Sequence, residues 1–392
     1  MAAFGKAMAG GLLLGLSLAL LARGAEGQAN GRGKKEVSGG STVHLGQERD
    51  VWRPLIHTTV NLSQINSIKS SFQLRTFDPE GVVFYGDTKN GEDWFVLSLT
   101  DGIPMMQISK EGMLISVTGG PKLNDGEWHT LEVSNHGKFV ILEVDGSGGL
   151  VVGMQTKQME EGISGQLRLA LGGILIDKEQ LIVQFEPQMD GCVREGSWLN
   201  LSVPWEAEAE ELWPCHPNIQ PGSYFPGTGF AVFNTSVFKL GEDHGVKIEL
   251  WGDFSQMDGT ILSIKAPGQE LMFALVANNN TKEVTLSFWQ EKISVKSTFK
   301  RLLVTFQKDV LKVLQDEDES TTSVLSSNPE SHNSYLTTWK EGRLAFGGLL
   351  GDDGAGSQFL TGCLKKIQVQ SRDLDLDSAD KHVSVSSHSC PA

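Results

Sequence analysis

Short runs of alternating apolar and polar residues recur along most of the chain. Examples are WFVLSL (94–99), HTLEV (129–133), FVILEV (139–144), QLRLAL (166–171) and KIEL (247–250). Alternation with a period of two places the apolar side chains on one face of a β-strand. Glycine-rich and Asp-rich turn sequences separate the runs, and helical periodicity is confined to EAEAEELW (206–213). The pattern predicts an all-β fold in which antiparallel sheets pack as a jelly-roll sandwich.

The pattern occurs twice. MDGCVR (189–194) matches LTGCLK (360–365), and upstream of each, GQLRLALGG (165–173) matches GRLAFGG (342–348). Two units of the same kind, each under about 200 residues, explain the conserved order of these segments. We expect a first domain over residues 45–217 and a second over residues 218–392.

Three other segments have a composition of their own. Residues 1–24 combine Lys6 with an apolar stretch and small residues near Gly24, which is typical of a secretory signal peptide. A membrane anchor is the alternative, but the stretch is too short to span a bilayer comfortably. Residues 25–44 are expected to form a flexible lead-in, and residues 316–335 a long acidic loop. Because no second apolar run reaches spanning length, we expect no membrane insertion of the mature chain.

Charge and motifs exclude several functions. The formal net charge is −15, with 33 Lys and Arg against 48 Asp and Glu. A chain with this excess of acidic residues is not expected to present a continuous basic surface that could bind phosphate groups. This argues against binding to nucleic acid and to anionic membranes. Common hydrolase, protease and phosphate-binding motifs are missing from the sequence. A carboxylate pair for glycoside hydrolysis has no fixed spacing and stays open, but we expect no enzyme.

The cysteines and sequons fit a secreted glycoprotein. Four cysteines allow three connectivities, and the spacing favours Cys192–Cys215 and Cys363–Cys390. A zinc site is the alternative, but it would favour closer pairs of the C-x-x-C kind. Candidate N-glycan positions are Asn61, Asn200, Asn234 and Asn279.

Several segments together carry a family resemblance. They are SSFQLRTFDPEGVVFYG (70–86), DWFVLSLTDG (93–102), LNDGEWHTLEV (123–133) and DGCVR (190–194). The array resembles the laminin G-like domain, repeated as two consecutive units from about residue 45 onward. Without Gla or EGF modules ahead of the pair, the chain is similar to the steroid-carrying plasma members of this family, in a non-mammalian vertebrate form. The resemblance implies a secreted, homodimeric carrier of androgens and oestrogens, with the steroid between the sheets of the first domain.

The resemblance also implies roles for single residues. Ser70 would anchor the ring A oxygen of a steroid, Asp93 would bind at ring D, and Phe95 would stack on the rings. Lys110 stands where the mammalian pattern carries an asparagine, and Asn135 where it carries a methionine, which puts the ranking of ligands in doubt. The remaining pocket-lining positions are Val133, Val140, Leu167 and Leu199. The plain alternatives are a water-facing serine at position 70 and a turn aspartate at position 93.

The same resemblance implies a metal site at FDPEG (77–81). Asp78, Glu80 and the carbonyl of Gln188 would bind calcium, which prefers hard oxygen ligands. A plain acidic turn is the alternative. The zinc-binding histidines of the family are not matched, because Glu111 and Ser164 stand there, so we expect no zinc site of that kind. The second unit carries GDFSQMDG (252–259) instead of FDPEG, and we expect neither calcium nor steroid in it.

An adhesive or receptor-binding laminin G-like protein is the second hypothesis. A heparin-binding version would need clustered Lys and Arg, and only short runs such as GRGKK (31–35) are present. A receptor-binding version stays open. The combination of Ser70, Asp93 and Phe95 favours the carrier hypothesis. An adhesive domain would have no functional need for polar ligand-binding residues within an apolar interior.

Overall fold

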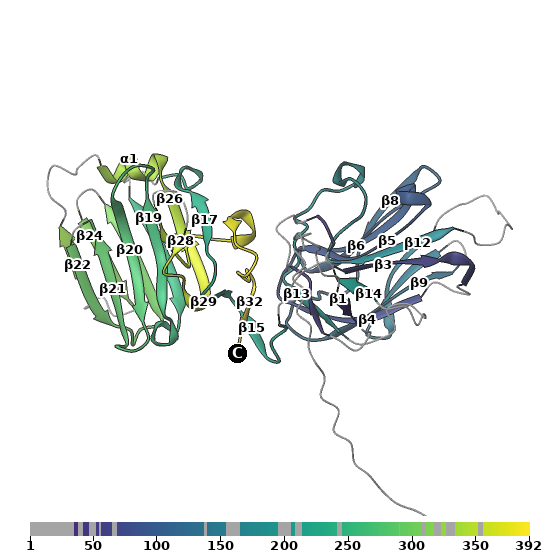
Figure 1. Ribbon diagram of the computed structural model, residues 1–392, viewed down its shortest axis with the longest axis horizontal. Helices are drawn as coiled ribbons and strands as arrows, with labels where there is room; N and C mark the ends of the chain where they lie inside the picture. Colours follow the sequence, from purple (N-terminus) through teal and green to yellow (C-terminus); the bar gives the residue numbers. More distant parts are fainter. Residues whose placement is uncertain are drawn as a thin grey trace, which may run out of the picture. The chain divides into compact units, whose positions relative to one another are not determined.

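A computed structural model shows an almost entirely β protein (Figure 1). It describes residues 35–37, 42–46, 52–54, 56–64, 69–136, 139–153, 165–194, 205–207, 214–240, 245–289, 291–307, 310–316, 323–326, 334–351 and 356–392. Residues 33–392 form one compact unit. Among the described strands, those before residue 208 and those after residue 218 never share a sheet. The boundary between residues 217 and 218 stays a prediction.

The first sandwich contains two antiparallel sheets. Its strands are β1 (Lys35–Val37), β2 (Val43–His44), β3 (Ile56–Asn61), β4 (Lys69–Thr76), β5 (Gly81–Thr88), β6 (Asp93–Thr100), β7 (Ile103–Lys110), β8 (Met113–Thr118), β9 (His129–His136), β10 (Phe139–Val144), β11 (Ser147–Gly153), β12 (Gln166–Leu171), β13 (Gly191–Arg194) and β14 (Trp205–Ala207). Among the described strands one sheet has the order β1-β14-β3-β12-β5-β6-β7-β8, and the other β11-β10-β9-β4-β13-β2. The fold class is therefore as predicted.

Strand alternation decides where the main core of this sandwich lies. On β6, Leu97 and Leu99 join the apolar cluster between the two sheets, with Phe95 packed against it. On β4, Phe72 and Leu74 join the same cluster from the opposite sheet. Burial of these side chains from both sheets supplies the main driving force for packing them together.

The outer face of β6 is covered as well. Trp94 and Val96 belong to a second cluster that includes Phe185, with Trp52 packed against it. The rings of Trp52 and Phe185 meet edge to face, with centroids 5.5 Å apart. The Gln107 side chain fixes the covering segment, because its Oε1 accepts hydrogen bonds from the backbone N–H groups of Ile182 and Val183. A strand buried on both faces explains why burial on β6 is nearly continuous.

The second sandwich repeats the arrangement. Its strands are β15 (Ile219–Pro221), β16 (Ser223–Pro226), β17 (Ala231–Asn234), β18 (Val246–Gly252), β19 (Gly259–Lys265), β20 (Leu271–Asn278), β21 (Glu283–Phe288), β22 (Glu291–Lys296), β23 (Arg301–Gln307), β24 (Val310–Gln315), β25 (Ser323–Ser326), β26 (Arg343–Phe346), β27 (Leu349–Leu350), β28 (Gly356–Ser357), β29 (Thr361–Val369), β30 (Arg372–Asp373), β31 (Asp380–Lys381) and β32 (Ser389–Pro391). Helix α1 spans Ser334–Glu341. The two larger described sheets have the orders β16-β29-β18-β23-β24-β25 and β22-β21-β20-β19-β26-β17-β31.

The internal repeat is visible in the strand pairing. β12 pairs with β5 in the first sandwich, and β26, which carries the matching sequence, pairs with β19 in the second. β5 begins at Gly81 and β19 at Gly259, and both glycines have positive φ angles. Gly81 packs against the carbonyl of Gln188, where a Cβ atom would lie 2.5 Å from the oxygen. A larger residue there would clash with the backbone, so the glycine marks an equivalent corner in both units.

Three sequence expectations need correction. Residues 205–207, at the start of the helix-like stretch, form β14, which pairs with β3; residues 208–213 lie outside the described residues. The segment expected to be an acidic loop contains β25, paired with β24, and its end begins α1. β1 and β2 lie in the expected lead-in. β14, β1 and β2 pair with strands that are distant in the sequence, which outweighs local composition, whereas β25 pairs with its neighbour β24.

Both predicted disulfides are present. Cys192–Cys215 closes a loop in the first half and Cys363–Cys390 in the second. The predicted signal peptide lies outside the described residues. Among the described residues, no helix has both the length and the apolar character needed to cross a bilayer.

One histidine ties two turns of the first sandwich together. The Nδ1 of His129 lies 2.8 Å from Asp145 Oδ2, and its Nε2 lies 3.1 Å from Asp125 Oδ1. Burial would lower the pKa of His129, but the hydrogen bonds and charges of the two carboxylates outweigh it and raise that pKa. They also hold the pKa values of Asp125 and Asp145 below their usual range, although partial burial opposes this.

We expect this cluster to make stability depend on pH. Because the pKa of His129 is raised on folding, its contribution is complete below the ordinary value of 6.5 and is lost as pH rises through the folded-state value. The carboxylate contributions are present above 3.8 and are lost in acid. His129→Gln should therefore lower the melting temperature most at about pH 5 to 6 and least at about pH 9. Thermal unfolding of both proteins across this range tests it, and a difference that is independent of pH would contradict the assignment.

Candidate ligand-binding site

Ser70 contributes a polar group to the inner face of the first sandwich. It lies on β4, shares a face with Phe72 and Leu74 by alternation, and is only 1 % exposed. Its neighbour on the next strand is Val133 of β9, which belongs to the inner cluster. The alternative that Ser70 faces water is therefore wrong, and its role in binding a ligand stays a prediction.

Asp93 and Phe95 belong to the opposite sheet. Asp93 begins β6 and is partly exposed, and its Oδ1 accepts a hydrogen bond of 2.9 Å from the backbone N–H of Glu111. Glu111 has a positive φ angle at the tip of the β7–β8 hairpin. Asp93 thus stabilises a turn and also stands at the rim of the face that carries Phe95.

Three packed aromatic rings connect β4, which carries Ser70, to β6, which carries Phe95. Phe72 packs edge to face on Phe84 with centroids 5.5 Å apart, and Phe84 packs in the same way on Phe95 at 5.4 Å. Edge-to-face contacts fix ring orientation in addition to burying area. Phe84 lies on β5, so the three rings connect both sheets.

The other predicted lining residues divide into two groups. Val133, Val140 and Leu167 are buried in the inner cluster, where ordinary core residues also lie, and their role in lining a pocket stays a prediction. Lys110 ends β7 partly exposed, and Asn135 is exposed on β9, opposite Val140 of β10. Leu199 lies outside the described residues.

The second sandwich replaces both polar anchors with apolar residues. Ile248 precedes Gly259 by the same number of residues as Ser70 precedes Gly81, and its partner Val304 matches Val133. By the same register, Leu271 stands where Asp93 stands in the first sandwich. Phe273 matches Phe95, and its ring packs on Phe306 with centroids 5.0 Å apart. Apolar side chains therefore occupy the positions that correspond to Ser70 and Asp93.

Asp78 lies at the loop between β4 and β5 and is almost fully buried. Its Oδ1 accepts a hydrogen bond from the Glu80 N–H at 3.0 Å, and its Oδ2 accepts one from the Asp190 N–H at 2.8 Å. Burial raises its pKa well above the usual range, the negative charge of Asp377 adds to this, and the charge of His388 opposes it. The carboxylate therefore lies in a site where positive charge is favourable.

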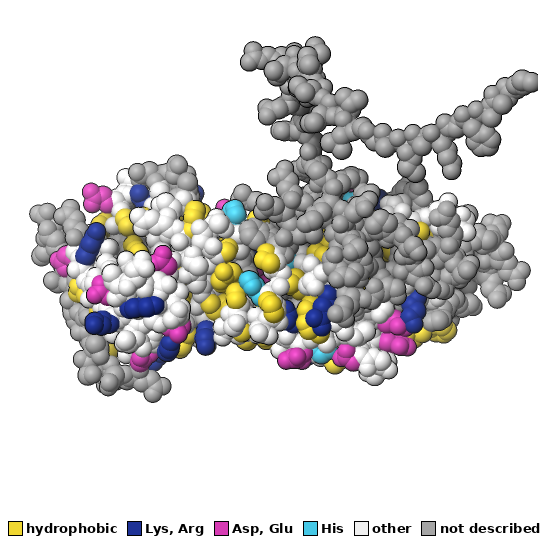
Figure 2. Space-filling view, turned by 60° about the horizontal axis from the view of Figure 1, so that its bottom comes forward, with side chains coloured by type: hydrophobic (Ala, Val, Ile, Leu, Met, Phe, Trp, Pro, Cys, Tyr) yellow, Lys and Arg dark blue, Asp and Glu magenta, His cyan; other side chains and the backbone are white. Residues whose placement is uncertain are grey.

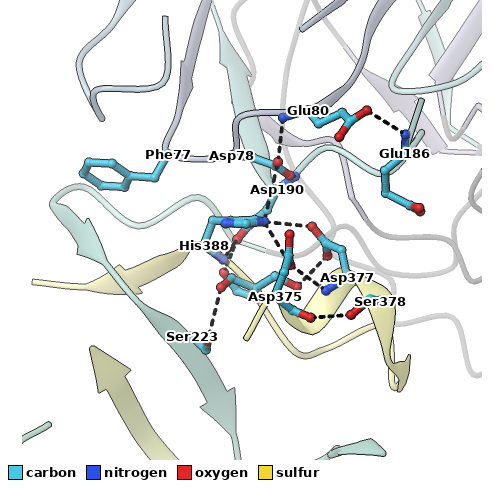
Figure 3. Close-up of polar contacts among 12 residues, drawn as sticks. Phe77, Asp78, Glu80, Glu186, Asp190, Ser223, Asp375, Asp377, Ser378 and His388 are labelled. Carbon is cyan, nitrogen blue, oxygen red and sulfur yellow. Dashed lines mark hydrogen bonds and ion pairs between the residues drawn. The ribbon is translucent and has the colours of Figure 1, made fainter. Parts of the chain in front are cut away.

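His388 brings that positive charge from the second half of the chain. Its Nε2 lies 2.8 Å from Asp377 Oδ2, 3.5 Å from Asp78 Oδ1 and 3.6 Å from Asp375 Oδ1. Figure 3 shows the ring between Asp78 on one side and Asp375 and Asp377 on the other. Burial would lower the pKa of His388, but the hydrogen bond to Asp377 and the surrounding carboxylates raise it to about 10.

Asp190 anchors the segment that carries His388. Its Oδ1 lies 3.0 Å from His44 Nε2. Its Oδ2 accepts hydrogen bonds from the Ser386 hydroxyl at 2.6 Å and from the N–H groups of His388 at 2.8 Å and Ser389 at 3.0 Å. These partners outweigh burial and hold the pKa of Asp190 far below its usual range. A buried carboxylate of the first half thus fixes residues 386–389.

The predicted calcium ligands lie in the β4–β5 loop and in the segment before β13. Glu80 Oε1 accepts a hydrogen bond of 3.1 Å from the Glu186 N–H, and Figure 3 shows its carboxylate directed toward Glu186. Gln188 is buried, and its carbonyl packs against Gly81. Hard oxygen atoms of this kind suit calcium. The arrangement brings Asp78 together with Asp377 and His388, and calcium binding by Asp78, Glu80 and Gln188 stays a prediction.

The sequons occupy different positions. Asn61 and Asn234 are exposed and Asn279 is partly exposed. Asn200 and the unmatched zinc position Ser164 lie outside the described residues. Exposure permits glycosylation but does not establish it.

Sequence reasoning missed Asp190, Asp377 and His388. Asp190 stands in MDGCVR, where the second unit has Thr361 in LTGCLK. This difference between the repeats was the signal that could have identified Asp190, because only the first unit carries a carboxylate at this position. His388 and Asp377 lie in a serine- and aspartate-rich tail that shows no strand periodicity.

Comparison with known proteins identifies the family. The model of the laminin G domain matches residues 74–203. A "Sex hormone-binding globulin" of Phodopus sungorus is 32 % identical over 350 residues, covering 86 % of this chain and 84 % of that protein. The chain belongs to the sex hormone-binding globulin family. The human "Sex hormone-binding globulin" agrees, at 32 % identity over 359 residues, covering 89 % of this chain and 86 % of that protein.

A solved structure supports the fold of this sex hormone-binding globulin family member. Domains LG4-5 of the mouse laminin α1 chain cover 91 % of the chain and 96 % of their own length, with a TM-score of 0.65 and 18 % identity. At this identity the likeness shows the laminin G-like fold alone. The recognised resemblance and the all-β fold class are thereby confirmed.

Proposed function

We propose that this protein is a secreted carrier that binds sex steroids, androgens and oestrogens, between the two sheets of its first sandwich. The observation that carries the proposal is the match along 86 % of the chain to proteins named sex hormone-binding globulin. The inner face of the first sandwich supports it, because Ser70 and Asp93 offer polar groups from opposite sheets beside Phe95.

The physical basis is burial of a rigid apolar ligand with polar ends. Removing roughly 400 Å² of apolar steroid surface from water at about 25 cal/mol per Å² contributes on the order of 10 kcal/mol before association costs. Ser70 would donate to the ring A oxygen, and the Asp93 carboxylate would accept from a ring D hydroxyl. These hydrogen bonds set orientation and selectivity, while apolar burial sets most of the affinity.

We expect Ser70→Ala to weaken binding of 5α-dihydrotestosterone by about 1 kcal/mol, roughly fivefold in Kd, because one neutral hydrogen bond is lost. Ser71→Ala is the matched control, since Ser71 neighbours Ser70 on β4 but lies on the opposite face. Equilibrium titration with the tritiated steroid measures both. If Ser70→Ala binds the steroid as tightly as Ser71→Ala, Ser70 does not contact the ligand. If only Ser71→Ala loses affinity, the ligand binds elsewhere.

We further propose secretion, with glycans on some of the exposed sequons. Mass spectrometry of protein from culture medium, before and after deglycosylation, tests both points. A product that remains inside the cell with residues 1–24 attached would contradict the proposal.

A structural calcium ion at the rim of the first sandwich is proposed as well. Asp78, Glu80 and the carbonyl of Gln188 would hold it and supply hard oxygen ligands. Bound calcium would stabilise the loop that precedes β5. Calorimetric titration of Glu80→Gln beside the parent protein tests it, and equal calcium binding would exclude Glu80.

A homodimer through the first sandwich is the proposed assembly. β8 ends the described strand order of its sheet, and Leu114 on this strand is 57 % exposed. An apolar edge strand offers backbone and side-chain groups to a second copy. Sedimentation velocity tests the mass, and a monomer at micromolar concentration would contradict the proposal.

The adhesive alternative has less support. Among the described residues on the face shown in Figure 2, Lys and Arg side chains are interspersed with Asp and Glu side chains and do not form one basic patch. A matrix glycan with many negative charges would need such a patch. We propose no enzymatic activity, because the relatives are named as binding globulins.

A further inference from the structure

A groove on the second sandwich has a glycosylation sequon in its wall. The groove has a volume of about 460 Å³, and Asn234, Val237, Phe238 and Leu374 are among the residues that line it. Asn234 is the exposed last residue of β17 and begins the sequon Asn-Thr-Ser (234–236). The groove is within the size range of sites that hold small ligands. A sugar attached to Asn234 would therefore start inside a hollow large enough to hold it.

Local structure holds this sequon in a fixed position. Thr235, the first residue of a 3-10 turn, is fully buried, and its N–H and hydroxyl donate to the Gly342 carbonyl at 3.0 and 2.8 Å. Asn234 occupies the N-cap position of this turn, but its side chain makes no capping hydrogen bond, although asparagine commonly does so there. Ser236, whose hydroxyl completes the sequon, is exposed. The Asn234 side chain is thus not used by the turn that follows it.

The floor of the groove is apolar. Val237 is 63 % exposed, and Phe238 and Leu374 are only partly buried. The ring of Phe238 is fixed by an edge-to-face contact with Phe233, with centroids 5.7 Å apart, and by a tilted contact with Trp339 at 6.2 Å. Exposed apolar side chains gathered in a hollow are typical of an interaction site. The face of an aromatic ring carries negative charge density and attracts the C–H groups on the face of a sugar ring.

The polar groups of the groove suit a neutral ligand. Arg343, Ser378 and Asp380 line it together with the apolar residues. One guanidinium and one carboxylate balance in charge, so the lining does not select an acidic or a basic partner. With the Ser378 hydroxyl they offer both donors and acceptors, which match the hydroxyl and acetamide groups of N-acetylglucosamine. The lining therefore combines an apolar floor with a few polar groups, as sites for small ligands do.

Covalent attachment decides which occupant the groove takes. Contacts between a free sugar and a shallow groove are weak, but a tethered group has an effective concentration of about millimolar or more. A sugar linked to Asn234 thus occupies the groove ahead of a free partner of similar intrinsic affinity. Its packing would cover the exposed side chains of Val237 and Phe238.

We propose that Asn234 carries an N-linked glycan whose first N-acetylglucosamine residues occupy this groove and stabilise the second sandwich. The inference rests on the proposed secretion, because N-glycans are added in the secretory pathway, and it does not depend on steroid binding. It assigns a structural role to one sequon, since neither Asn61 nor Asn279 lines this groove.

The first test compares sequon variants of the secreted full-length protein. Ser236→Ala removes the sequon but keeps Asn234, and Ser236→Thr changes the same residue but keeps the sequon. Thr281→Ala removes the sequon at Asn279, which lies on the same sandwich and whose Oδ1 accepts a hydrogen bond from Lys282. We expect Ser236→Ala to lower the melting temperature by about 2–4 °C, and the other two variants to lower it by less than about 1 °C.

The second test needs no variant that lacks the glycan. Peptide N-glycosidase is applied to the native and to the denatured parent, and mass spectrometry of the glycopeptides follows each site. A glycan packed in the groove should be released from native Asn234 at least about tenfold more slowly than from the denatured chain. Val237→Ser keeps the sequon but removes apolar contact, so it should speed the native release. This test decides if Ser236→Ala is not secreted.

Three results would overturn the inference alone. One is an unmodified Asn234 in a secreted chain that carries glycans at other sequons. Another is a melting temperature of Ser236→Ala equal to that of the parent. The third is native release at Asn234 as fast as release from the denatured chain. A chain that stays in the cell without a glycan at any sequon would instead contradict the proposed secretion, and this inference with it.

Discussion

Replacing Asp190 with alanine is expected to destabilise the protein by about 3–5 kcal/mol. The carboxylate is 3 % exposed and accepts hydrogen bonds from Ser386, His388 and Ser389, with His44 at its other oxygen. Its removal takes the acceptor from the His388 N–H and breaks the contacts with His44, Ser386 and Ser389, and each donor left without a partner costs about 1–3 kcal/mol. Urea unfolding with the disulfides intact measures the loss.

Two variants make the Asp190 experiment specific. Asp190→Asn keeps the size and one acceptor oxygen but removes the charge, so its loss should be smaller than that of the alanine variant. Asp101→Asn changes an exposed acid and should alter stability by less than about 0.5 kcal/mol. Hydrogen exchange should also show faster exchange of the 386–389 amides in Asp190→Ala. Unchanged exchange there, with parent-like unfolding, would contradict the assigned role.

Replacing Phe84 with alanine is expected to cost about 3–5 kcal/mol of stability and to weaken steroid binding as well. Phe84 is 2 % exposed and touches both Phe72 and Phe95 edge to face. The variant loses the buried ring and leaves a cavity between the sheets. It also removes the support of Phe95, the ring expected to stack on the steroid. Urea unfolding and steroid titration of one preparation measure both effects.

Phe139→Ala is the control for this core substitution. Phe139 lies on β10 of the same sandwich but is 49 % exposed. We expect it to lose less than about 1 kcal/mol and to bind steroid as the parent does. If Phe139→Ala destabilises as strongly as Phe84→Ala, the inner cluster is not the main core. If Phe84→Ala keeps the parent's steroid affinity, Phe95 does not depend on that contact.

Much of the fold follows from local pattern. Alternation on WFVLSL gives β6 and assigns Leu97 and Leu99 to the inner core, because a strand exposes successive side chains to opposite faces. The repeated cysteine segments predict two sandwiches and both disulfides. In contrast, β14 and β25 form where composition favours a helix and a loop. β14 depends on pairing with the distant β3, which a local window does not contain, and β25 forms through its pairing with the neighbouring β24.

The candidate site divides in the same way. Ser70, Asp93 and Phe95 can be assigned to faces by counting along β4 and β6, since alternation is a local property. The contact between Asp190 and His388 joins residues that are 198 positions apart in the sequence. Nothing in the tail sequence around His388 indicates burial, because its burial is created by packing against the first half. Such contacts become visible only in three dimensions.

The most direct test of the carrier proposal is equilibrium dialysis of the purified protein against tritiated 5α-dihydrotestosterone, with oestradiol as competitor. We predict saturable binding at one site per chain with a Kd on the order of nanomolar, because the second sandwich has Ile248 and Leu271 in place of the polar anchors. Competition by oestradiol should displace the label fully. An absence of saturable binding up to about 1 µM steroid would contradict the proposal and favour the adhesive or receptor-binding alternative.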